Sequence, residues 1–127
     1  MSEQEEIIAL MNEALLWAES TISSALAEPF AGQCANAFAM VLEYDLKNGS
    51  IGHSTLAEYH SAGLSVADVG LILIDGVVST IKDKGAGQPE DQRMRHIVDG
   101  LEKTIDGVVE AGEVSIFPGN GKYAQAG

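Results

Sequence analysis

The fold of this chain depends on the stretch Ser65-Val-Ala-Asp-Val-Gly-Leu-Ile-Leu-Ile-Asp-Gly-Val-Val-Ser-Thr-Ile-Lys-Asp-Lys84. An Asp-Gly pair between two apolar runs is a strong signal for a β-hairpin. A helix is the other interpretation, because Ser65 and Asp68 form a capping box and Gly85 suits a helix end. The apolar residues at helical spacing are Val66, Val69, Leu73, Val77 and Ile81. We favour the helix and keep the hairpin as the alternative.

Four further helices are predicted from apolar residues at helical spacing between recognisable start and stop signals. They run from Ser2 to about Leu26, from Phe30 to about Leu46, from Ser54 to Ser61, and from Pro89 to about Ala111. Pro29 ends the first helix or opens the second. The sequence therefore predicts an all-α fold, a compact bundle of four to five helices. One helical domain is expected over residues 1–112, followed by an irregular C-terminal arm over residues 113–127.

The length and composition are those of one globular domain. The chain has 127 residues, 46% of them hydrophobic, which suffices for a core. Its single cysteine, Cys34, excludes an intramolecular disulfide and favours a reducing compartment. The N-terminus is acidic where a secretory signal would be basic, and no apolar run approaches the roughly 18 residues that span a membrane. We expect a soluble, cytoplasmic protein.

The charge is strongly and unevenly negative. The net charge is −12, and the first basic residue is Lys47. Direct binding to nucleic acid or to anionic membranes is disfavoured, because both need cationic surfaces. A basic surface on another protein is the favoured partner. The alternative is that the charge only keeps the protein soluble.

The last helix concentrates acidic residues on one side. A single stripe is predicted for Asp99, Glu102, Asp106, Glu110 and Glu113, opposite the apolar residues Met94, Ile97, Val98, Leu101, Ile105, Val108 and Val109. Acids near a helix C-terminus oppose the helix dipole, and acids four residues apart repel each other. Such a stripe costs local stability, so we interpret it as a partner-binding surface.

A short repeat and the C-terminal arm supply the other candidate contacts. Ile74-Asp-Gly-Val-Val78 recurs as Ile105-Asp-Gly-Val-Val109. Glycine inside a helix costs about 1 kcal/mol relative to alanine. Gly76 and Gly107 are therefore candidates for close helix packing, within the chain or across a homodimer. Phe117 and Tyr123 are candidate contacts of the arm, on its own domain or on a partner.

No catalytic or metal-binding motif is found. The histidines His53, His60 and His96 lack partners at the helical spacing of a metal site, and Cys34 has the apolar surroundings of a core residue. The segment Gly119–Lys122 lacks the remaining residues of a phosphate-binding loop. We predict no catalytic residue, no metal and no cofactor, and hence no enzyme.

Three hypotheses for the function remain. The first is a non-enzymatic acidic helical protein that docks on a basic, for example nucleic-acid-binding, surface of a partner and inhibits or regulates it. Successive acids four residues apart rise about 6 Å along a helix, comparable with the phosphate spacing of a nucleic-acid strand. Phage-type inhibitors and immunity proteins work this way. The alternatives are a self-assembling structural or scaffold protein and a regulatory domain that binds a small molecule between its helices.

Overall fold

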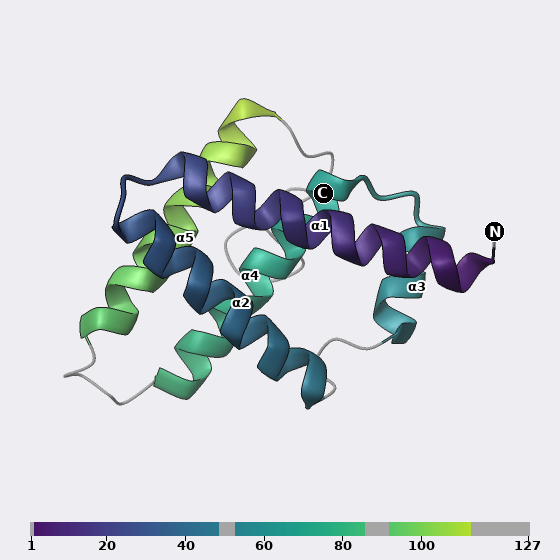
Figure 1. Cartoon of the computed structure of the whole chain (residues 1–127), viewed down its shortest axis with the longest axis horizontal. Coiled ribbons are helices and arrows are strands. Elements are labelled where there is room, and N and C mark those ends of the chain that lie inside the picture. Colours follow the sequence, from purple (N-terminus) through teal and green to yellow (C-terminus); the bar gives the residue numbers. More distant parts are fainter. Residues whose placement is uncertain (1, 49–52, 86–91, 113–127) are drawn as a thin grey trace.

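Five α-helices make up the described part of the chain (Figure 1). The structure, a computed structural model, describes residues 2–48, 53–85 and 92–112. The helices are α1 (Glu3–Ala25), α2 (Phe30–Lys47), α3 (His53–Ser61), α4 (Val66–Gly85) and α5 (Gln92–Ala111), and there is no strand in these ranges. The all-α prediction is confirmed. The stretch from Ser65 to Lys84 is helix α4, so the hairpin alternative is excluded.

The helix ends follow the signals in the sequence. At the start of α4, the backbone N–H of Asp68 donates to Ser65 Oγ, and the backbone N–H of Ser65 donates to Asp68 Oδ2, both at 3.1 Å. This reciprocal pair is a complete capping box. At α1, the backbone N–H of Glu5 donates to Ser2 Oγ at 3.2 Å. Gly63 and Gly112, with φ of +74° and +72°, end α3 and α5 in a backbone conformation that suits glycine.

Two expectations about boundaries have different outcomes. Pro29 stands at the N-cap of α2, so it opens the second helix and does not end the first. The predicted first turn of the last helix at Pro89 lies outside the described residues. The predicted arm over residues 113–127 also lies outside them, with its candidate contacts Phe117 and Tyr123.

Helix α4 lies at the centre of the bundle. It packs against α1, α2 and α5, while α3 packs against α1 (Figure 1). Its buried apolar residues cover more than half of its circumference: Val69, Leu71, Leu73, Ile74, Val77, Val78 and Ile81. A helix with so wide an apolar side must be covered by more than one neighbour. The apolar run that made this stretch resemble two strands is therefore a consequence of its central place.

Among the described glycines, Gly70 and Gly100 leave the least room for a side chain. A Cβ atom at Gly70 would clash with the Trp17 ring and lie 3.2 Å from the backbone oxygen of Ala14. A Cβ atom at Gly100 would lie 2.8 Å from Cys34 Sγ. The missing side chain at Gly70 thus lets α1 pack against α4, and the missing side chain at Gly100 lets α2 pack against α5.

The two glycines of the repeated string do not have this role within the chain. A Cβ atom at Gly76 or at Gly107 would meet nothing within 4 Å. Neither residue brings two helices of this chain together, which corrects the prediction of close intramolecular packing. A contact of these glycines across a dimer stays a prediction.

Substitution of these glycines by alanine tests the packing. We expect Gly70→Ala to lower the free energy of unfolding by about 1–3 kcal/mol, because the added methyl group overpacks the contact of α1 with α4. The matched variant Gly76→Ala should raise it by about 0.5–1 kcal/mol through helix propensity alone. Urea unfolding followed by circular dichroism measures both. Equal effects of the two variants would contradict the assignment.

A buried carboxylate joins α2 to α4. Asp45 is only 2% exposed, and Thr80 Oγ1 donates to both of its carboxylate oxygens at 3.0 Å. Burial raises the pKa of the Asp45 carboxyl, and the hydrogen bond from Thr80 opposes part of that rise. The folded protein therefore holds the charged form of Asp45 at a cost in stability.

Asp45→Asn removes this cost and keeps an oxygen that accepts the hydrogen bond from Thr80. We expect the free energy of unfolding at pH 7 to rise by on the order of 1 kcal/mol. Because folding raises the pKa, the folded state binds the proton more tightly. The wild type thus loses stability relative to the variant as pH rises from the unfolded-state pKa through the folded-state pKa. Urea unfolding at a series of pH values measures the difference, and a variant less stable than the wild type at pH 7 would refute this account.

Candidate functional site

The predicted acidic stripe of α5 lies on the side away from the core, but its members differ. Asp99 and Glu110 are exposed, whereas Glu102 and Asp106 are half-buried. Lys82 of α4 donates to Glu102 Oε2 at 2.8 Å, and Asp106 also takes part in an interaction. Glu113 lies outside the described residues. The stripe therefore offers two exposed carboxylates, at Asp99 and Glu110, and a third that is neutralised by a lysine.

Cations interrupt the same stripe. Arg95 and Lys103 are exposed and stand four residues before and after Asp99. On a helix these positions are neighbours of Asp99 on one face. The local field of α5 is consequently much weaker than its acidic residues alone would produce.

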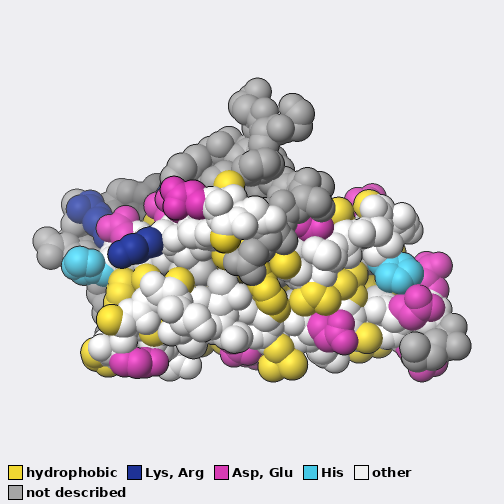
Figure 2. Space-filling view, turned by 90° about the horizontal axis from the view of Figure 1, so that it is seen from above, with side chains coloured by type: hydrophobic (Ala, Val, Ile, Leu, Met, Phe, Trp, Pro, Cys, Tyr) yellow, Lys and Arg dark blue, Asp and Glu magenta, His cyan; other side chains and the backbone are white. Residues whose placement is uncertain are grey.

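Helix α1 carries acidic residues with no Lys or Arg among them, although Ile8 and Leu16 are also exposed on it. Residues 1–46 contain eight acidic residues and no Lys or Arg. Five of the eight are on α1: Glu3, Glu5, Glu6 and Glu13 are exposed, and Glu19 is half-buried. We call these five residues the α1 acidic surface. Figure 2 looks down on the molecule from above Figure 1, and the Lys and Arg side chains visible in it lie at the end opposite the N-terminus.

A histidine is the described partner of this surface. His60 Nε2 of α3 lies 3.3 Å from Glu6 Oε1, and both side chains are partly exposed. A partly exposed pair of this kind contributes at most about 1 kcal/mol. Its structural effect is to fasten α3 to the N-terminal part of α1.

Cys34 and His96, which were weighed as reactive or metal-binding residues, make packing contacts. Cys34 is fully buried, burial raises its pKa, and its thiol donates to the backbone oxygen of Ile97 at 3.9 Å. His96 makes an edge contact with the ring of Phe30, their centroids 6.3 Å apart. Within residues 2–48, 53–85 and 92–112, no three His, Cys, Asp or Glu side chains are grouped so that they could hold a metal ion.

An open groove of about 310 Å³ runs between α2 and α5. Its walls are mostly apolar: Ala37, Met40 and Val41 from α2 and Met94 and Ile97 from α5, with the amides of Gln33 and Asn36 at its edge. Drug-sized ligands are usually held in deeper clefts with a few convergent polar groups. The groove is better suited to another apolar surface than to a small molecule.

The comparisons with known proteins give no further guide. No protein-family model matches the chain, and neither the curated proteins nor the solved structures contain a match. None of the helices in the described part of the chain combines the length and the apolar character needed to cross a membrane.

Two features of these surfaces were not predicted, although the sequence contains a signal for each. Arg95 and Lys103 stand at helical spacing from Asp99, so they share a face with the predicted acidic stripe. Pro29–Leu42 is the longest run in the chain without an Asp, Glu, Lys or Arg, at 14 residues. In a chain with a net charge of −12, a run this long without charged residues indicates an uncharged surface in addition to the acidic one.

Proposed function

We propose that this protein is a non-enzymatic acidic helical protein that docks on a basic surface of a partner protein and so inhibits or regulates it. The observation that carries the proposal is the α1 acidic surface, in a part of the sequence that contains no lysine or arginine before Lys47. The α5 stripe, first predicted as the docking site, is the weaker candidate because Lys82, Arg95 and Lys103 lie within or beside it.

The electrostatics of the N-terminal half support the choice of α1. The first cation, Lys47, is 3.0 Å from Glu43 of the same helix, so it is already paired. Asp45 faces inward. The field outside this part of the chain therefore comes mainly from the carboxylates of α1 and from the exposed Glu28. Complementary charge accelerates association with a basic partner and fixes its orientation.

The spacing of the acids suits a groove lined with cations. Glu6 and Glu13 are seven residues apart, which places them on one line of the helix about 10 Å from each other. Glu5 and Glu19 widen the surface on its other side. A basic groove that holds a nucleic-acid strand also presents a row of cations, and occupation of that groove by α1 would exclude the nucleic acid.

Charge reversal tests the proposal with a matched control. The partner is first captured from the native host with the wild-type protein and identified. Its affinity is then measured for Glu5→Lys/Glu13→Lys/Glu19→Lys and for Asp99→Lys/Asp106→Lys/Glu110→Lys. Each replacement changes the charge by two units, so both triple variants have a net charge of −6 in place of −12.

We expect the α1 variant to bind at least about tenfold more weakly and the α5 variant to lose much less. Raising the salt concentration should weaken the wild-type complex, because screening reduces attraction between opposite charges. Circular dichroism verifies that both variants remain helical. Equal losses would show a response to net charge alone, and unchanged affinity of the α1 variant would refute the proposed surface.

A further inference from the structure

The outward side of α2 differs from the rest of the molecule in its charge. Within α2, residues Phe30–Leu42 carry no charged side chain. The three ionisable groups of its last turns leave no net field outside, since Asp45 is buried and Glu43 pairs with Lys47 at 3.0 Å. A helix with an electrically neutral solvent side is thus built into a protein with a net charge of −12.

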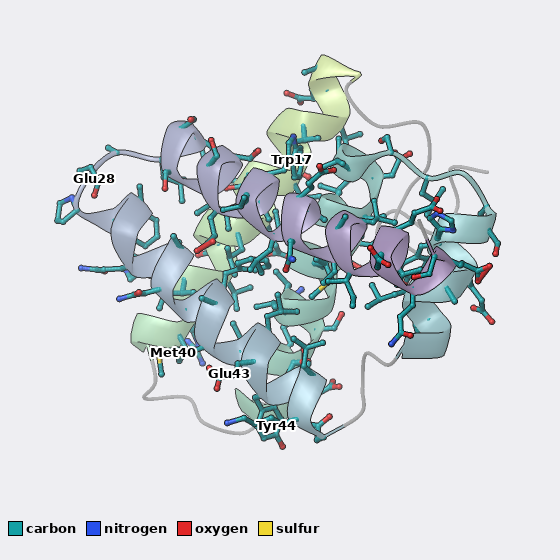
Figure 3. All side chains as sticks on the ribbon, turned by 45° about the vertical axis from the view of Figure 1, so that its right-hand side comes forward. Trp17, Glu28, Met40, Glu43 and Tyr44 are labelled. Atoms are coloured by element: carbon teal, nitrogen blue, oxygen red, sulfur yellow. The ribbon has the colours of Figure 1, made fainter. Side chains whose placement is uncertain are left out.

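The same side is partly apolar, with Met40 beside the exposed amides of Gln33 and Asn36. Met40 stands opposite the core-facing residues of α2 and is 71% exposed, the most of any large hydrophobic residue among those described. Tyr44, one turn further, is 46% exposed. Figure 3 shows Met40, Glu43 and Tyr44 on the same outer side of α2. Beside Met40, the groove between α2 and α5 continues this apolar surface to Met94 and Ile97. We call Ala37, Met40, Val41, Tyr44 and the α5 residues Met94 and Ile97 the α2 patch.

We propose that the α2 patch is the contact surface of a homodimer, in which two copies of this chain pack α2 against α2 around a two-fold axis near Met40. A second copy has the same charge of −12, so it is repelled at every acidic face. It can approach with little repulsion only where acids are missing or paired. The α2 patch is such a place, because Glu43, the acid nearest to Met40 on this helix, pairs with Lys47. The two-fold operation places identical patches opposite each other, so each Met40 side chain reaches the other copy's groove.

A basic partner is a poorer occupant of this face. Its cations would find no exposed carboxylate on residues 30–42, and they would lose hydration against methionine and valine side chains. Arg95, exposed and next to Met94 of the groove, would repel them as well. The face therefore matches a neutral, apolar surface, which the chain itself supplies.

Sedimentation equilibrium of the wild type from about 1 to about 500 µM tests the dimer. We expect a monomer–dimer equilibrium that tightens when salt is raised from about 0.05 to about 0.5 M, because screening weakens repulsion between like charges. This response is opposite in sign to that of the proposed complex with a basic partner. The two proposals can therefore fail independently, and the direction of the salt response tells the dimer apart from the complex with a basic partner.

The variant Met40→Glu is expected to weaken dimerisation at least about 100-fold, because two carboxylates would be buried unpaired in the contact. Leu16→Glu is the matched control: Leu16 is 66% exposed on α1, outside the patch, and should change the dissociation constant by no more than about twofold. Both residues are exposed and glutamate is a good helix former, so both variants should fold.

A cysteine at the same position gives an independent readout. Under mild oxidation, Met40→Cys should form a disulfide-linked dimer faster than Leu16→Cys, which reports random collision. The native Cys34 does not interfere, since it is fully buried. A wild type that stays monomeric at every concentration and salt overturns the proposal. So does a dimer that Met40→Glu leaves intact, or equal cross-linking of the two cysteine variants.

Discussion

A helix with buried apolar residues over more than half of its circumference needs several neighbours to cover it, and the covering of α4 governs the rest of this structure. Helix α1 can lie close enough only because Gly70 leaves room for the Trp17 ring and for the backbone at Ala14. Helices α2 and α5 cover other sides of α4, and they come close to each other at Gly100. Each covering helix is left with one outward side, and these outward sides are the surfaces available for function.

Much of this architecture could be predicted from local signals. The capping pairs Ser2/Glu5 and Ser65/Asp68 and the glycines after α3 and α5 act within a few residues, so they are visible in the sequence. The Asp75-Gly76 pair was ambiguous because its local preference is that of a turn. Burial of both flanking apolar runs within one helix overrides that preference, and burial is a property of the whole fold.

The residues of close approach were harder to predict, for a similar reason. The repeated string led to the prediction of Gly76 and Gly107. A glycine allows another helix to come close, however, only where it lies on a buried side of its own helix. Gly70 is flanked by the buried Val69 and Leu71, and Gly100 follows the buried Ile97 by less than one turn. Position relative to the core-facing residues was thus a better guide than recurrence. The stripe on α5 shows the same limit, since the ion pair of Glu102 comes from Lys82 on another helix.

The distribution of charge argues against solubility as its sole purpose. A protein needs only a sufficient net charge to stay dispersed, and spreading nineteen acidic residues evenly would lower their mutual repulsion. Here five of them lie on α1 and none lies on residues 30–42 of α2, although both helices cover the same core. Removing charge from a face costs hydration of that face and exposes Met40 to water. Covering the face with another apolar surface removes this free-energy cost, whereas the carboxylates of α1 are stabilised most by contact with cations. The carboxylates of α1 and the uncharged residues around Met40 on α2 therefore favour different kinds of contact, and a change in salt concentration acts on the two contacts in opposite directions.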